Sequence, residues 1–202
     1  IATMSDEDAQ RYLSYDLEHT NKVSKYYRVT ETTNGTISTE VSEEEAINAA
    51  KNNISTISTL HTTTYKNIQI TASKINTNKY LIYLSNDWLI TPRVKSYDVI
   101  AMRVDDATIT AGTQNGTQMY TINGTSDTVD YSYQGTNMVL SSNGFGISMN
   151  LVDAASGFTC DIEAIVTATS QWATVYGSYQ HAMTAVTLAK SKSYTISHNG
   201  YG

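Results

Sequence analysis

The stretch NGTQMYTING, residues 115–124, places an Asn-Gly dipeptide on each side of a short run rich in Thr, Met, Tyr and Ile. A two-residue type I′ turn needs a positive φ at both central positions, and Asn followed by Gly adopts it at least cost. Three further Asn-Gly pairs stand at residues 34–35, 143–144 and 199–200. Each lies between short runs of strand-forming residues, so each predicts a hairpin turn. The C-terminal half therefore indicates a meander of antiparallel strands.

From residue 62 onward, apolar and polar side chains alternate with the period of two that is typical of strands. Ile147 and Met149, for example, alternate with Ser148 and Asn150. This pattern predicts a mainly β fold, an antiparallel β-sandwich or meander of about ten to twelve short strands. We expect the strands near 64–74, 79–85, 96–104, 107–113, 117–122, 128–133, 137–141, 146–152, 158–168, 172–178, 183–189 and 193–197.

A first N-terminal helix is predicted before the strands begin. Ser5 is placed to cap it, and the spacing of Leu13 and Leu17 extends it to about residue 18. Residues 24–40 are then expected to form a hairpin that turns at Asn34-Gly35.

A second N-terminal helix is predicted by a capping box, with Ser42 as the N-cap and Glu45 three residues later. Apolar residues at helical spacing carry this helix to about Leu60. We therefore divide the chain into a helix-hairpin-helix segment, residues 1–61, packed on an antiparallel β-sandwich domain, residues 62–202.

The last ten residues predict an incomplete hairpin. A strand over 193–197 enters the turn at residues 199–200, and the sequence ends two residues later. The missing second arm would leave a strand edge unpaired. Either the chain is cut at a turn, or a second copy supplies the missing strand at an assembly edge formed by Tyr194, Ile196 and Tyr201.

Charge and composition restrict the possible partners. The net charge is −6 and the 13 basic residues are scattered, so nucleic acid is not expected as a partner. No apolar run is long enough to span a membrane. Only 16% of the residues are charged, and Thr, Ser and Asn take their place, as in many exported β proteins. Because the sequence begins at Ile1 rather than Met, we expect a mature secreted or cell-surface protein.

Cysteine chemistry depends on one residue, Cys160, so no disulfide within the chain is expected. A lone cysteine on a strand is most often a small buried apolar side chain. The order Cys160, His181, Asn199 would permit a cysteine protease triad, although nothing nearby marks a low-pKa thiolate. Residues 158–160 resemble the sortase family, which implies an arginine after the cysteine. Every arginine here precedes Cys160, so we do not assign that family.

Other catalytic patterns are sparse. Asp161 and Glu163 are two residues apart and so share one face of a predicted strand, which leaves a carboxylate-dependent hydrolase as an alternative. The four histidines show no metal-ligand spacing, and no nucleotide-binding loop is present. We therefore expect no metal, no cofactor and no enzymatic activity.

Tyrosine dominates the aromatic residues, with 15 Tyr against 2 Phe and 2 Trp. Tyrosine suits half-exposed surfaces and interfaces, because its ring is apolar and its tip is polar. Trp88 follows Ser85-Asn86-Asp87 on a stretch that resembles a loop, and it is the best candidate for stacking on a sugar. Asp87, Tyr80 and Tyr83 complete this candidate ligand site.

The sequence as a whole favours a non-enzymatic exported surface or structural protein that associates with itself through β-edges and tyrosine-rich faces. An adhesin or a carbohydrate- or receptor-binding module, from a bacterial surface or a phage fibre, is the first alternative. The hydrolase that depends on Cys160 or on the Asp161 and Glu163 carboxylates is the second.

Overall fold

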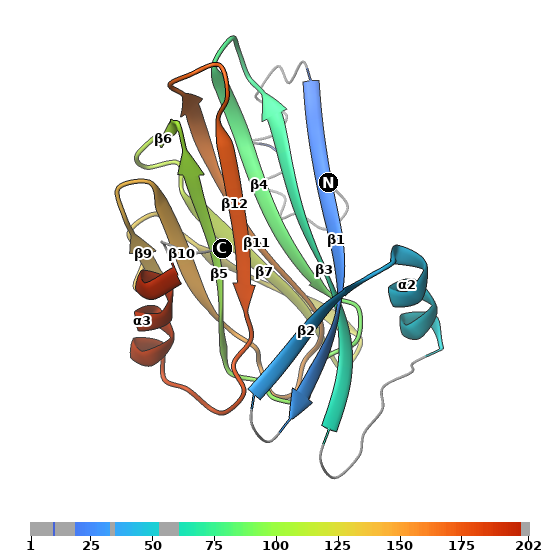
Figure 1. Cartoon of the computed structure of the whole chain (residues 1–202). Coiled ribbons are helices and arrows are strands. Elements are labelled where there is room, and N and C mark those ends of the chain that lie inside the picture. Colours follow the sequence, from blue (N-terminus) through green and yellow to red (C-terminus); the bar gives the residue numbers. More distant parts are fainter. Residues whose placement is uncertain (1–9, 11–18, 33–34, 53–60, 199–202) are drawn as a thin grey trace.

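The structure, a computed structural model, describes residues 10, 19–32, 35–52 and 61–198. The described residues form two antiparallel sheets packed face to face, accompanied by the helices α2 and α3 (Figure 1). The strands are β1 His19–Thr32, β2 Gly35–Val41, β3 His61–Lys74, β4 Lys79–Trp88, β5 Tyr97–Asp105, β6 Ala107–Ile109, β7 Asn115–Ile122, β8 Thr125–Tyr131, β9 Met138–Leu140, β10 Gly144–Asn150, β11 Ser156–Ala168 and β12 Thr174–Gln180. The helices are α2 Glu43–Lys51 and α3 Leu188–His198.

The two sheets differ in width. The larger has eight strands in the order β2-β1-β3-β4-β11-β7-β8, with β6 beside β11, and the smaller has four in the order β12-β5-β10-β9. All of the strand pairs are antiparallel. The predicted mainly β, antiparallel fold is therefore confirmed.

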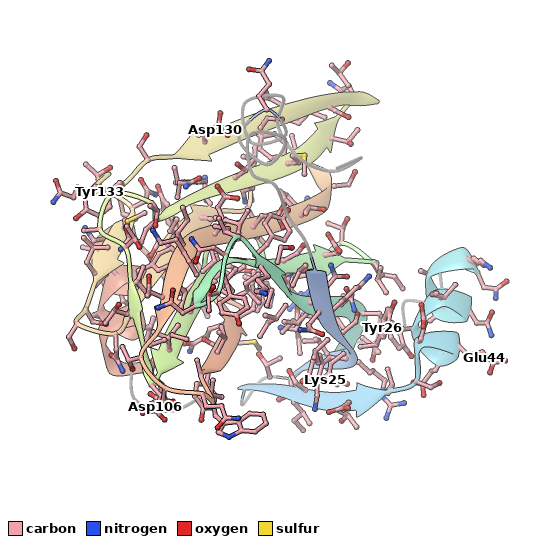
Figure 2. All side chains as sticks on the ribbon, turned by 90° about the horizontal axis from the view of Figure 1, so that it is seen from above. Lys25, Tyr26, Glu44, Asp106, Asp130 and Tyr133 are labelled. Atoms are coloured by element: carbon pink, nitrogen blue, oxygen red, sulfur yellow. The ribbon has the colours of Figure 1, made fainter. Side chains whose placement is uncertain are left out.

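The main core lies between the sheets, where side chains from the two inner faces fill the space (Figure 2). Because successive side chains of a strand point to opposite faces, one alternate set from each central strand lies inside. Leu84 in β4 and Ile162 in β11 meet Phe145 and Ile147 in β10, all at 1% exposure or less.

Helix α2 begins as the capping box predicts. The Ser42 hydroxyl accepts a hydrogen bond from the backbone N–H of Glu45 at 3.1 Å. Ala46 and Ala49 pack on Tyr65 and form a second, smaller apolar cluster against the larger sheet. The helix ends at Lys51, and the remainder of its predicted span, residues 53–60, lies outside the described residues.

The Asn-Gly pairs have two different roles. Asn123 and Gly124 have φ values of 50° and 78° and join β7 to β8 in a two-residue turn, as predicted. Residues 143–144 also lie at a hairpin, between β9 and β10. The turn predicted at Asn115-Gly116 is wrong, because both residues lie in β7. A Cβ on Gly116 would come within 2.6 Å of the Asp161 carbonyl oxygen, so glycine there permits the close approach of β11.

The two strands predicted near the C-terminus are wrong. The strands expected at 183–189 and 193–197 are absent, and residues 188–198 form α3 instead. This helix lies against β5 and β10 of the smaller sheet, where Ser191 is fully buried (Figure 1). Tyr194 and Ile196 therefore belong to a helix and not to an open strand edge. Tyr201 and the last Asn-Gly pair lie outside the described residues.

The two predicted N-terminal helices are not borne out as a pair, since one described helix is early and the other is C-terminal. The helix expected over 5–18 lies outside the described residues, except for Gln10. A domain division at residue 62 stays a prediction, although β1 pairs with β3 along its whole length. No helix among the described residues is long and apolar enough to cross a membrane.

Candidate functional site

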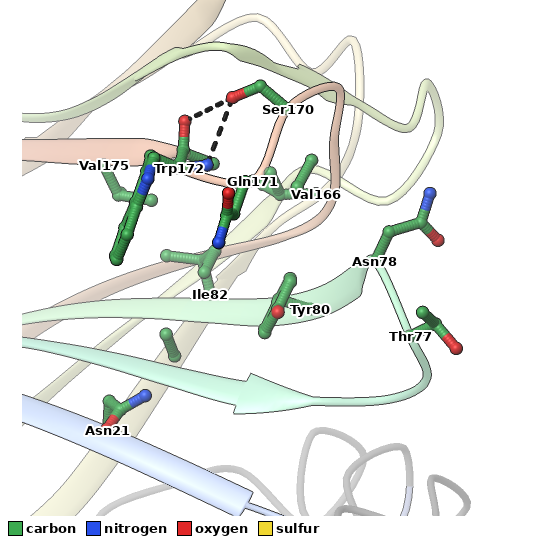
Figure 3. Close-up of a pocket in the computed structure, with 13 residues that line it drawn as sticks. Asn21, Thr77, Asn78, Tyr80, Ile82, Val166, Ser170, Gln171, Trp172 and Val175 are labelled. Atoms are coloured by element: carbon green, nitrogen blue, oxygen red, sulfur yellow. Dashed lines mark hydrogen bonds between the residues drawn. The ribbon is translucent and has the colours of Figure 1, made fainter.

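A cavity of about 530 Å³ opens between the larger sheet and the segment that joins β11 to β12 (Figure 3). We call it the Trp172 cavity. Strands β1, β3, β4 and β11 supply one side of it, and the turn before β12 supplies the other. Its lining residues are Asn21, Ala72, Thr77, Asn78, Tyr80, Ile82, Val166, Ala168, Ser170, Gln171, Trp172, Ala173 and Val175.

The floor of the Trp172 cavity is apolar because strand alternation directs one set of side chains inward. Tyr80 and Ile82 share the inner face of β4, and Val166 pairs with Tyr80 across the neighbouring strand β11. Asn21 approaches from β1, across the cavity from Trp172 (Figure 3). The site therefore combines an apolar base with polar groups above it.

Trp172 stands at the rim with 78% of its surface exposed. Its backbone is held by one residue: the Ser170 hydroxyl donates to the Trp172 carbonyl at 2.6 Å and accepts from the Trp172 N–H at 3.2 Å. An indole ring in this position offers its apolar face to a ligand, and Trp is among the residue types enriched at contact surfaces. The ring is thus presented to solvent on a fixed turn.

The polar groups of the Trp172 cavity are amides and hydroxyls. Asn21, Asn78 and Gln171 each offer both a donor and an acceptor, and Tyr80 and Ser170 offer hydroxyls. None of the described residues that line the cavity is charged. This set matches a neutral ligand that has many hydroxyl groups.

The structure does not group the four residues predicted as a ligand site. Tyr80 lines the Trp172 cavity. Trp88 is not on a loop: it ends β4 on the inner face, is 4% exposed, and donates from Nε1 to the Tyr179 hydroxyl at 3.0 Å. Its ring is therefore packed inside the sandwich and is not presented to solvent, and its role in stacking on a sugar stays a prediction.

Tyr83 and Asp87 lie on the opposite face of β4 from Tyr80 and Trp88, because their positions differ by odd numbers. The Tyr83 hydroxyl donates to the Asp161 carboxylate, and the Thr159 hydroxyl donates to Asp87 at 2.8 Å. Neither residue lines the Trp172 cavity. Strand alternation thus divides the predicted site between two faces of the sheet.

A buried polar cluster surrounds His181, which follows β12. Its Nδ1 lies 2.9 Å from Oδ2 of Asp98, and the Tyr179 hydroxyl donates to the same carboxylate at 2.6 Å. Its Nε2 faces Glu31. Burial lowers the pKa of His181, but the hydrogen bonds and charges of Asp98 and Glu31 outweigh it and raise that pKa to about 9. The imidazole is therefore a cation held between two carboxylates at neutral pH.

Cys160 and His181 do not form a catalytic pair. Cys160 is fully buried, and its sulfur lies 3.8 Å from the Tyr179 hydroxyl, while both ring nitrogens of His181 face carboxylates. Burial, together with the Asp98 carboxylate, raises the pKa of the thiol well above its usual range. A nucleophilic cysteine needs the opposite shift. Asn199, the third member of the predicted triad, lies outside the described residues.

Asp161 and Glu163 share the outer face of β11, as predicted, and are 2% and 3% exposed. Both have interaction partners, and neither lines the Trp172 cavity. Among the described residues, no group of three or more His, Cys, Asp and Glu side chains is placed to hold a metal ion.

Trp172 is the site residue that sequence reasoning missed. It stands in Ser170-Gln171-Trp172-Ala173, among the small and polar neighbours that also drew attention to Trp88. The two tryptophans have similar surroundings in the sequence, and only their placement relative to the sheets separates the exposed ring from the buried one.

No protein-family model matches the sequence, and no curated protein matches it. One solved structure, from work on the structural basis for the promiscuous specificity of carbohydrate-binding modules of the β-sandwich superfamily, is similar at 9% sequence identity and a TM-score of 0.27. The match covers 83% of this chain and 62% of that one, so this chain spans less than two thirds of its length.

Proposed function

We propose that this protein is a non-catalytic carbohydrate-binding module that takes a neutral saccharide in the Trp172 cavity. The observation that supports this most is the 78% exposed ring of Trp172 at the rim of an uncharged cavity. Apolar faces of sugar rings stack on aromatic side chains, while their hydroxyls need donors and acceptors at the edge. A volume of about 530 Å³ lies in the range of small-molecule sites.

The binding mode follows from the geometry of the cavity. One sugar ring stacks on Trp172, and its hydroxyls exchange hydrogen bonds with Gln171 and with Asn21 across the cavity. Because no charged side chain from the described residues lines the cavity, a carboxylate or sulfate group on the sugar would find no matching charge there. Neutral glycans are therefore preferred over acidic ones.

Export and a cell-surface role remain part of this proposal, based on the low content of charged residues. Self-association through a C-terminal strand edge is not part of it, because residues 188–198 form α3. A glycan-binding surface protein would act as an adhesin or as a targeting module for a partner.

The test is a screen against an array of neutral and acidic glycans, followed by titration of the best ligand with tryptophan fluorescence as the signal. Trp172 is exposed and Trp88 is buried, so binding should quench or blue-shift only the exposed component. We expect Trp172→Ala to weaken binding at least about fivefold, because stacking on an aromatic ring contributes of the order of 1–3 kcal/mol.

Tyr176→Ala is the matched control, because Tyr176 is a half-exposed aromatic of β12 that packs on Arg103 and does not line the Trp172 cavity. It should bind like the wild type. Absence of saturable binding to any neutral glycan, or equal binding by Trp172→Ala, would rule out this function.

A further inference from the structure

A second cavity, of about 330 Å³, lies between β1, β2 and the segment after β12. We call it the Lys66 cavity. Lys66 and His181 line its buried part, and Ser38 and Gln180 are exposed at its mouth. None of the described residues that line it is acidic. It is separate from the Trp172 cavity, since the two share no lining residue.

The ammonium group of Lys66 is nearly without hydrogen-bond acceptors. The residue is 5% exposed, and the only acceptor among the described residues is the Tyr179 carbonyl oxygen, at a long 3.5 Å. Its other neighbours are the rings of Tyr179 and Trp88, with centroids at 4.7 and 5.6 Å. A lysine has three N–H donors, and burying them unused is costly. The group therefore lacks the acceptors that its burial demands.

Both buried carboxylates near the cavity lie against His181 and not against Lys66. Glu31 and Asp98 both lie against His181, and Arg93 approaches Glu31 at 3.8 Å. The Arg93 side chain is 68% exposed to solvent, so Lys66 and His181 are the buried cations here, and Lys66 has no carboxylate in hydrogen-bond contact among the described residues. Burial lowers the pKa of Lys66 to about 8, partly opposed by Asp98, so the ammonium is still mostly protonated at pH 7.

We propose that the Lys66 cavity binds a small molecule through one carboxylate group, whose oxygens accept hydrogen bonds from Nζ of Lys66. A carboxylate supplies the acceptors that Lys66 lacks, in a charge-assisted hydrogen bond. The Ser38 hydroxyl and the Gln180 amide at the mouth contact the remainder of the ligand. This site goes beyond the proposed glycan function and does not depend on it.

The experiment is an NMR titration of the protein at pH 7 with sodium acetate, sodium glucuronate and sodium phosphate in turn, using sodium chloride at equal ionic strength as the blank. We expect saturable shifts of the amides of Ser38, Lys66, Gln180 and His181 with both carboxylates and none with chloride. Shifts that do not saturate, or phosphate binding more tightly than either carboxylate, would overturn the proposal.

Two variants test the role of Lys66. Lys66→Met keeps the length of the side chain and removes the charge, and it should bind at least about tenfold more weakly. Ser38→Tyr places a large side chain at the mouth, on an exposed position of the edge strand β2, and should also abolish binding. Unchanged affinity in either folded variant would overturn the proposal. Trp172→Ala should bind the carboxylates normally, which separates a failure here from a failure of glycan binding.

Discussion

Nε2 of His181 lies 3.3 Å from Oε1 of Glu31, although 150 residues separate the two in the sequence. Glu31 belongs to β1 of the larger sheet, and His181 follows β12 of the smaller one. With Asp98 on the other ring nitrogen, this contact joins the two layers of the sandwich through a buried charge. Ionisation of one imidazole is thereby linked to the packing of the sheets.

His181 should therefore titrate well above the ordinary range of a histidine. The pKa of His181 is raised to about 9, so its ring should stay protonated through neutral pH. A two-dimensional NMR titration of the imidazole signals between pH 5 and 10 measures this directly. If all four histidines changed state below pH 7.5, the buried ion cluster would not exist as described.

Stability should depend on pH for the same reason. The pKa of His181 is higher in the folded state, about 9, than its ordinary 6.5, so its contribution is complete below pH 6.5 and is lost as the pH rises through 9. We expect the free energy of unfolding to fall by up to about 3 kcal/mol over this window. Lys66 acts in the opposite sense, because its lowered pKa favours folding as the pH rises from 8 to 10.5.

Urea unfolding of Lys66→Met isolates the histidine contribution, since the lysine is removed. The free energy of unfolding should then fall between pH 6.5 and 9 without the opposing increase that Lys66 causes. A flat profile in this variant would contradict the assignment of the pKa shift to His181.

The thiol of Cys160 should be inert in the folded protein. It is fully buried, and its raised pKa leaves almost no thiolate at pH 8. We expect labelling by a disulfide reagent at least about a hundredfold slower than in denaturant, at a rate set by opening of the fold. Ser193→Cys, on the exposed side of α3, provides a reactive reference in the same protein. Rapid labelling of Cys160 would instead favour the alternative of a cysteine-dependent hydrolase.

Two glycines of the Asn-Gly pairs should respond differently to alanine. At Gly116 the new Cβ would meet the Asp161 backbone oxygen at 2.6 Å and Ile147 at 2.8 Å, so we expect a loss of about 2–3 kcal/mol. At Gly124 the space is open, and only the φ of +78° is unfavourable, so the loss should be near 1 kcal/mol. Chemical denaturation of both variants measures the difference, and the reverse order would contradict the placement of β7 against β11.

Helix α3 should be essential to the fold. Ser191→Arg puts a charge at a fully buried position against the smaller sheet, and we expect a loss of about 3 kcal/mol. Ser193→Arg, on the exposed side of the same helix, is the matched control and should change stability by less than about 0.5 kcal/mol. Equal effects of the two changes in thermal unfolding would mean that α3 does not pack on β5 and β10.

The parts of the fold that could be predicted from sequence are those determined by neighbouring residues. The Ser42 capping box and the Asn123-Gly124 turn each depend on a few adjacent side chains, and both are found as expected. Helix α3 is the opposite case. Its Ser, Thr and Tyr content favours a strand locally, and contact with β5 and β10 stabilises the helix instead.

The candidate site was less predictable than the fold. Trp88 and Trp172 both follow polar residues in the sequence. The Trp88 ring is buried in the sandwich, whereas Trp172 lies on the turn before β12 and is exposed, and this difference depends on the packing of the sheets. The cluster of Glu31, Asp98 and His181 joins residues that are far apart in the chain. Single-sequence patterns contain no information about such pairings.

Within the part of the chain that the structure describes, strand β12 is hydrogen-bonded to one neighbouring strand, β5. Both cavities take lining residues from β12 or from its ends. Val175 contributes near one end and Tyr179 near the other. A small displacement of this one strand would therefore reshape both cavities together. If a ligand in one cavity moves β12, linkage requires that each ligand alter the affinity of the other by the same factor. The seven-residue edge strand β12 would then couple ligand binding in the two cavities.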